Sequence, residues 1–108
     1  MRTAEFAASV RLDADAAVLD LSGEITSAAE AGLLAAYDEV KDAGVVICDF
    51  ANVDYINSTG IALIVGILAR ARSSGQEIRA RGLAEHYREI FRITRLSDFM
   101  TILDDEGE

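Results

Sequence analysis

A short β-branched run, followed closely by an apolar helical segment, constrains the fold of this chain most. Residues 45–50 (Val-Val-Ile-Cys-Asp-Phe) are typical of a central strand buried on both faces. A loop is expected at 51–57, and residues 58–72 then have the pattern of a helix that ends at the Ser-Ser-Gly of 73–75. A strand that leads into a helix is half of a crossover unit, so the sequence predicts an α/β fold with parallel strands.

The remaining segments extend this pattern into a single mixed sheet. Residues 6–12 and 17–21 predict two strands of a hairpin around a turn at 13–15, and Ser-Gly-Glu at 22–24 is expected to end the second strand. The predicted order is β-β-α-β-α-β-α-β, with helices packed on a sheet of four to five strands. The other predicted elements are helices at 28–41 and 83–93, a strand at 77–81 and a last short strand or turn at 99–103.

The bulk properties indicate one cytoplasmic domain. The 108 residues suit a single domain over 1–108, and the longest strongly apolar stretch, 61–69, is far below the ~20 residues that a membrane-spanning helix needs. The first residues lack the pattern of a signal peptide. Cys48 is the only cysteine, which rules out an internal disulfide and a cysteine-based metal cluster. We therefore expect no membrane contact, no metal and a reducing compartment, the cytoplasm.

The charge of the chain is strongly acidic but unevenly distributed. A net charge of −9 argues against nucleic acid as a partner, because phosphate backbones attract clustered Lys and Arg. Residues 70–103 nevertheless hold seven arginines against four acidic residues. This stretch is either a solvated face of helices and strand, or a local basic patch that meets an acidic partner or a phosphorylated group.

The most informative motif is Asn57-Ser58-Thr59-Gly60, between the predicted central strand and the apolar helix. In an open α/β sheet, the loops at the carboxyl ends of strands are where ligands and partners bind. A phosphate on Ser58 would lie at the positive end of the helix dipole, near unpaired N–H groups, and would be stabilised there. The alternative is that Ser58 or Asn57 is an ordinary N-cap with no further role.

The helix that follows is apolar on every face between residues 60 and 69. A small domain covers only one side of such a helix, so some of its first residues are expected to be exposed as a binding surface. The alternative is a helix wedged between its neighbours. The candidates for exposure are Gly60, Ile61, Ile64 and Val65.

The order of these motifs resembles the STAS domain family, named for sulfate transporters and anti-sigma factor antagonists. Members of that family have a strand, a loop that ends in Asp-Ser-Ser-Gly or Asp-Ser-Thr-Gly, and an apolar helix, like residues 45–50 and 53–61 here. Leu-Asp-Leu-Ser-Gly-Glu-Ile at 19–25 and Ile-Phe-Arg-Ile-Thr-Arg-Leu at 90–96 are also similar to family segments. The resemblance covers nearly the whole chain.

The resemblance implies a free-standing anti-sigma factor antagonist with no cofactor. Its partners would be an anti-sigma factor with serine kinase activity, which phosphorylates Ser58 and so switches the chain off, and a phosphatase that reverses the reaction. Asn57 stands where the family usually has Asp, and it keeps a capping side chain but removes a negative charge beside the phosphorylated serine. The residues expected to contact the partner are Asn57, Ser58, Thr59, Gly60, Ile61, Ile64 and Val65.

Two other functions are open on the sequence. One is a STAS-type scaffold or interaction module, in a stress-sensing or transport-accessory complex, that is not regulated by phosphorylation. The other is a small enzyme that uses Asp49, Asp54 and Ser58, but the sequence supplies no general base or metal-ligand spacing for it. His86, the only histidine, is expected on a helix surface. We therefore expect no catalytic residues and predict that the chain is not an enzyme.

Overall fold

One five-stranded mixed sheet runs through the computed structural model, which describes residues 5–13 and 16–103. The strands lie in the order β1-β2-β3-β4-β5; β1 is antiparallel to β2, and the other neighbours are parallel. This confirms the predicted fold class and element order. The strands are β1 (Ala7–Asp13), β2 (Ala16–Ile25), β3 (Val45–Ile56), β4 (Glu77–Arg81) and β5 (Thr101–Ile102).

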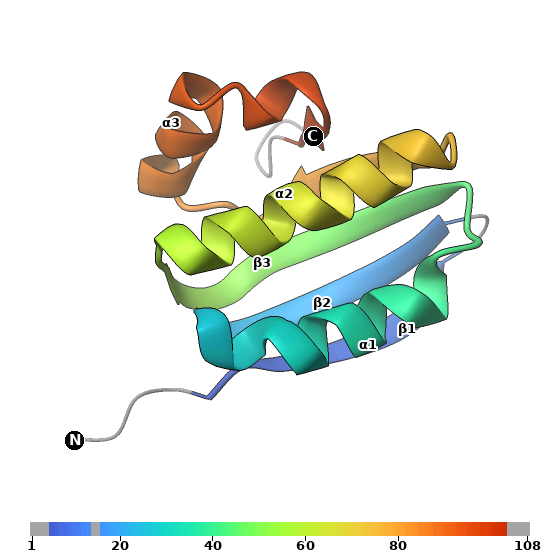
Figure 1. Cartoon of the computed structure of the whole chain (residues 1–108), viewed down its shortest axis with the longest axis horizontal. Helices are drawn as coiled ribbons and strands as arrows, with labels where there is room; N and C mark the ends of the chain where they lie inside the picture. Colours follow the sequence, from blue (N-terminus) through green and yellow to red (C-terminus); the bar gives the residue numbers. More distant parts are fainter. Residues whose placement is uncertain (1–4, 14–15, 104–108) are drawn as a thin grey trace.

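The helices in the described residues connect the parallel strands. The two longest, α1 and α2, lie over one face of the sheet, and α3 follows β4 (Figure 1). None of the described helices is long and apolar enough to cross a membrane. The α-helices are α1 (Glu30–Val40), α2 (Ser58–Ser73) and α3 (Glu85–Ile93), and the 3₁₀ turns are η1 (Ser27–Ala29) and η2 (Leu96–Asp98).

The hydrophobic core lies between the sheet and the helices. Alternate residues of the central strands, such as Leu19 of β2 and Val46 of β3, face the helices and are fully buried. From α3, Phe91 enters the same core and packs edge to face on Phe50, with ring centroids 6.2 Å apart. The largest fully buried side chains of the core are Tyr37, Phe91, Leu19, Ile25, Leu33 and Val46.

A buried glutamine ties α1 to the connection between α2 and β4. The Oη of Tyr37 donates to the Gln76 Oε1 at 2.7 Å. The Gln76 Nε2 donates to the carbonyl oxygens of Val40 at 2.9 Å and Ala43 at 2.7 Å. Because both the carbonyl oxygen and the amide group of the Gln76 side chain are used, its burial is compensated, and the α2–β4 connection is tied to the end of α1.

The prediction that residues 45–50 are buried on both faces is wrong. Val46, Cys48 and Phe50 are buried, whereas the alternate residues Val45 and Ile47 are only half-buried. The reason is that α1 and α2 cover one face of the sheet (Figure 1). Residues of β3 that point toward these helices are buried, and the alternate residues, which point to the other face, are more accessible.

Both central strands are longer than their sequence pattern indicates. The loop expected at 51–57 is strand as far as Ile56, and the stop expected at 22–24 is also strand, because β2 continues to Ile25. The two polar stretches pair with each other, with register shifts between Asp20 and Ser22 and between Gly23 and Glu24. Long-range pairing of this kind overrides local turn signals.

The other boundaries differ by a few residues. The first helix opens with a 3₁₀ turn, the third begins at Glu85 rather than at 83, and the last strand is reduced to Thr101–Ile102. The strand at 77–81 is confirmed. Of the turn expected at 13–15, residues 14 and 15 lie outside the described residues.

Candidate functional site

The Asn57-Ser58-Thr59-Gly60 motif lies at the junction between the central strand, β3, and α2. β3 ends at Ile56 and α2 begins at Ser58, so a single residue, Asn57, makes the turn. Because β2, β3 and β4 are parallel, their carboxyl ends meet at this same edge of the sheet. The motif therefore occupies the position in the fold where α/β sheets bind ligands and partners.

Asn57 is the N-cap of α2. Its backbone is extended, with φ −96° and ψ −176°, and its Oδ1 accepts a hydrogen bond from the Gly60 N–H at 2.9 Å. Its carbonyl oxygen accepts the first helical hydrogen bond, from the Ile61 N–H at 2.9 Å. Both capping contacts are thus made by Asn57, as expected for one of the two residues considered for this role.

Ser58 is the first residue inside the helix and does not cap it. Ser58 and Thr59 are both exposed. Neither hydroxyl takes part in any hydrogen bond that the described residues make. The first turn of α2, which is described in full, contains no acidic side chain. The Ser58 hydroxyl is therefore accessible, unengaged and close to the positive end of the helix dipole.

The four apolar candidates divide between the surface and the core. Val65 is 43% exposed and Ile61 is half-buried, whereas Gly60 and Ile64 are buried. The helix is thus neither free on one whole side nor wedged completely between its neighbours. Its outer face presents Ile61 and Val65 along one line from Ser58, because residues four apart share a face of a helix.

Gly60 lets the start of α2 touch the end of β2. A Cβ atom at this position would lie 2.0 Å from the carbonyl oxygen of Ile25, which is far inside van der Waals contact. The same oxygen accepts a hydrogen bond from the Asn57 N–H at 3.3 Å. The end of β2 therefore fixes the position of the cap, and with it the direction in which Ser58 is presented.

Tyr87 of α3, which was not among the residues predicted for the site, contacts the end of the strand that precedes the motif. The Ile56 N–H, two residues before Ser58, donates to the Tyr87 Oη at 2.9 Å. The ring of the exposed His86 packs against that of Tyr87, with centroids 4.9 Å apart. A hydrogen bond between a side chain and a backbone 31 residues away leaves no pattern in the local sequence, so Tyr87 could not be predicted as part of the site.

The enzyme alternative gains no support from this geometry. Asp49 is already bound: its Oδ2 lies 3.0 Å from the Nε of Arg81, and its Oδ1 accepts from the Ala51 N–H at 3.0 Å. Asp54 is exposed, and no hydrogen bond or ion pair joins it to Ser58 among the described residues. Across residues 5–13 and 16–103, no group of three or more His, Cys, Asp or Glu side chains could hold a metal ion.

Most arginines of the 70–103 stretch are paired with neighbouring carboxylates. Five of the seven make ion pairs with carboxylates, mostly at exposed positions where each pair contributes little to stability. This supports the interpretation as a solvated charged surface. The pairs are Arg70–Asp38, Arg79–Glu77, Arg81–Asp49, Arg92–Glu89 and Arg95–Asp98.

The comparison with protein families gives a direct match over most of the chain. The family model described as "Mlab, STAS domain" matches residues 8–104. The chain belongs to the STAS domain family. The resemblance drawn from the sequence motifs is thereby confirmed, and the candidate site at Ser58 lies at a strand-to-helix junction of a STAS domain.

Curated relatives and solved structures include proteins named for sigma-factor regulation. An anti-sigma-B factor antagonist of Listeria monocytogenes is 36% identical over 70 residues, 65% of this chain and 61% of the relative, so the chain spans less than two thirds of that protein. An anti-sigma factor antagonist from Mycobacterium paratuberculosis superimposes with a TM-score of 0.72 at 21% identity, over 91% of this chain and 85% of the other. The phosphorylated form of the Bacillus cell fate determinant SpoIIAA gives 0.70 at 17%, over 93% and 94%. At these identities the structures show a shared fold.

Proposed function

We propose that this chain is an anti-sigma factor antagonist that is switched by phosphorylation of Ser58. In its unmodified form it binds an anti-sigma factor that is also a serine kinase. Phosphorylation of Ser58 releases that partner, and a phosphatase restores the binding form. The names of the curated relatives and of the structures with the same fold support this choice. The proposal places the chain in the cytoplasm as a single regulatory domain with no cofactor.

The main observation behind the proposal is that Asn57 caps α2, whereas Ser58 does not. Asn57 holds the cap, so the Ser58 hydroxyl can accept a phosphate without loss of any contact that keeps the helix in place. The added phosphate would carry about two negative charges at a helix N-terminus, where backbone N–H groups stabilise it. The fold would be retained, and only the surface beside Ile61 and Val65 would change.

The proposed partner surface consists of the exposed part of the motif and of the helix face behind it. Asn57, Ser58 and Thr59 supply its polar edge, and Ile61 and Val65 supply its apolar part. Gly60 and Ile64 are buried beneath them and would contribute by holding this surface in place.

Phosphorylation by a kinase that binds the chain tests the switch. Incubated with that kinase and ATP, the protein should gain one phosphate, and phosphopeptide mapping should place it on Ser58. The Ser58→Ala variant should accept none, while Thr59→Val, a matched change at the neighbouring exposed hydroxyl, should accept it normally. A label on Thr59 or Ser27 would contradict the proposed site.

Asn57→Asp tests whether a negative charge at position 57 affects phosphorylation of Ser58 by the kinase. Asn and Asp cap helices about equally well, so the substitution adds a charge next to Ser58 with little change in stability. We expect faster phosphorylation in single-turnover assays if the kinase uses that carboxylate. A slower rate would show that Asn57 is matched to this protein's own kinase, and equal rates would limit its role to capping.

A scaffold module without phosphorylation is the second candidate function. It is favoured by one observation, the neutral Asn57 where the family usually has Asp. If a partner kinase binds the chain tightly and leaves Ser58 unlabelled, this function replaces the switch. A transporter operon around the gene would point the same way, whereas a neighbouring kinase or sigma factor would support the antagonist.

A further inference from the structure

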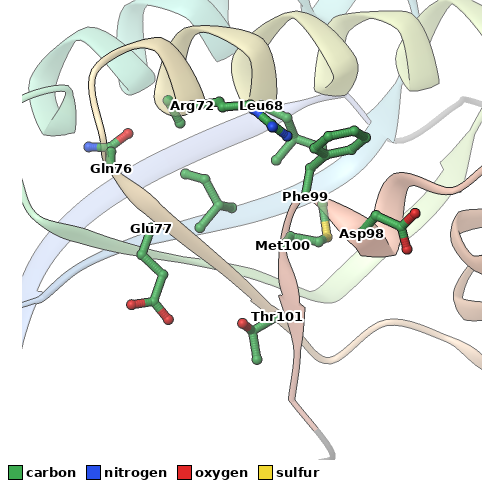
Figure 2. A pocket seen from close by; sticks show the side chains of 10 residues that line it. Leu68, Arg72, Gln76, Glu77, Asp98, Phe99, Met100 and Thr101 are labelled. Atoms are coloured by element: carbon green, nitrogen blue, oxygen red, sulfur yellow. The ribbon is translucent and has the colours of Figure 1, made fainter.

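The C-terminal half of α2 and the segment from η2 to β5 enclose a groove on the surface (Figure 2). Its larger part has a volume of about 290 Å³ and extends toward Gln76 and Thr101. A second, apolar part of about 200 Å³ lies between Val65 and Leu96. Leu68, Arg72 and Phe99 line both parts, so we treat them as one feature, the α2–η2 groove.

Two large apolar side chains are exposed at the groove. Phe99 is 47% exposed at its rim, and Val65 is 43% exposed on the facing side of α2. Exposed aromatic and aliphatic side chains beside a hollow are typical of surfaces that bind another protein, since an apolar side chain of the partner can fill the hollow.

The charges around the groove are balanced except at Arg72. The two acidic side chains of the lining are already paired: Glu77 lies 2.8 Å from Arg79, and Asp98 lies 2.8 Å from Arg95. The Arg72 guanidinium instead lies over the Phe99 ring, 5.0 Å from its centroid (Figure 2). In the part of the chain that the structure describes, it has no carboxylate partner.

An arginine beside an aromatic ring and without a carboxylate partner can bind a carboxylate. Its position 5.0 Å from the Phe99 ring centroid is within the range of a cation–π contact, and a guanidinium has N–H groups enough to donate to a carboxylate as well. Among the described residues, the groove thus offers an apolar hollow beside one arginine that has no carboxylate partner. Charge complementarity selects an occupant with an apolar side chain next to a carboxylate.

The groove is continuous with the surface proposed for the partner at Ser58. Ser58, Ile61 and Val65 lie along α2 in that order, and Val65 itself lines the groove. At 1.5 Å per residue, Val65 is about 10 Å from Ser58 along the helix and Arg72 about 21 Å. A protein interface of ordinary size covers such a distance.

We propose that the α2–η2 groove is a second contact for the anti-sigma factor. In this complex an apolar side chain of the partner fills the hollow between Val65 and Phe99, and an adjacent carboxylate of the partner pairs with Arg72. This inference rests on the proposed function. It adds a contact at the end of α2 opposite to Ser58, which a phosphate on Ser58 would not reach directly.

Two variants test the groove against matched controls. Phe99→Ala should weaken binding of the unphosphorylated chain to the anti-sigma factor at least fivefold by calorimetry, and Arg72→Gln at least threefold. Leu12→Ala removes an 81% exposed side chain from β1, far from the groove, and should stay within twofold. Arg70→Gln makes the same charge change on the same helix, at a residue that pairs with Asp38 of α1, and should also stay within twofold.

The possible outcomes distinguish a failure of the groove inference from a failure of the proposed function. If Phe99→Ala and Arg72→Gln bind like wild type while Ser58→Asp does not, the partner ends short of the groove and the inference is wrong, although the proposed function stands. If the wild-type chain binds no anti-sigma factor, both are wrong. If the chain alone self-associates and Phe99→Ala abolishes this, a second copy fills the groove and the inference fails. Arg72 is exposed, so its variant reports on binding even if Phe99→Ala lowers the melting temperature.

Discussion

Two adjacent residues, Asn57 and Ser58, are placed differently at the start of α2. The Asn57 side chain and carbonyl take the capping contacts, with Gly60 and Ile61 as donors. Ser58 follows as the first helical residue with its hydroxyl unengaged. A capping serine would be a poor switch, because its modification would remove a contact worth about 0.5–2 kcal/mol. Here the position proposed for phosphorylation is not the one that caps the helix.

Ser58→Asp should separate binding from folding. An acidic side chain in the first turn of a helix is favourable by about 0.3–1 kcal/mol, so thermal denaturation should show an unchanged or slightly raised melting temperature. Binding to the anti-sigma factor should weaken at least tenfold, about 1.4 kcal/mol. Ser58→Asn is the control, because it has the same shape without the charge. Equal losses in both variants would mean that the size of the side chain matters and not its charge.

At the scale of elements, different contacts hold the two ends of α2 in place. Its start is pressed against the last residue of β2 through Gly60, and Tyr87 of α3 accepts a hydrogen bond from the strand that precedes it. Beyond its end, Gln76 connects the chain to α1 through Tyr37 and backbone carbonyls. The outer face of α2 thereby runs from Ser58 to Arg72 between two ends that are held by contacts with other elements.

Two glycines of α2 should respond oppositely to the same substitution. Gly60→Ala would place a Cβ 2.0 Å from the Ile25 carbonyl oxygen, so we expect it to lower the free energy of unfolding by about 1–3 kcal/mol or more. Gly66→Ala meets nothing within 4 Å and should raise it by about 0.5–1 kcal/mol, because alanine favours the helix. Urea denaturation of both variants measures the difference. A stable Gly60→Ala protein would contradict the close approach of α2 to β2.

On the scale of the whole molecule, the core is made by elements that are far apart in the sequence. Leu19, Val46 and Phe91 come from a hairpin strand, a crossover strand and the third helix, and all three are fully buried. Cys48 lies in the same core, and burial raises the pKa of its thiol to about 12 from an ordinary value of 9.0. A neutral thiol in the folded core couples the stability of the domain to alkaline pH.

Stability should therefore fall between pH 9 and pH 12 in a way that depends on Cys48. In this window the unfolded chain releases the thiol proton and the folded chain keeps it, so the folded state binds more protons and the free energy of unfolding decreases as pH rises. The contribution of one thiol is at most about 1.4 kcal/mol per pH unit. Urea denaturation of wild type and Cys48→Ala at pH 7–11 measures it: the variant should lose stability less steeply. Parallel curves would contradict a raised thiol pKa in the folded core, because the groups that both proteins share cancel in the difference.

The sequence by itself determined the order of elements and the position of the motif. Helical and strand patterns, β-branched runs and Gly or Ser breaks act over a few residues, so they predicted the strand at 77–81 and the helix that begins at Ser58. The same local patterns, together with the Ser-Thr-Gly motif, led to the STAS family.

Only the tertiary structure decided what lies on each face of those elements. The extension of β2 to Ile25 depends on pairing with β3, and the burial of Gly60 and Ile64 depends on what packs against them. The hydrogen bond to Tyr87 and the groove beside Phe99 join segments that are distant in the chain. Such contacts follow from which surfaces meet when the sheet forms, and a local pattern carries no record of a neighbour that is supplied by another part of the chain.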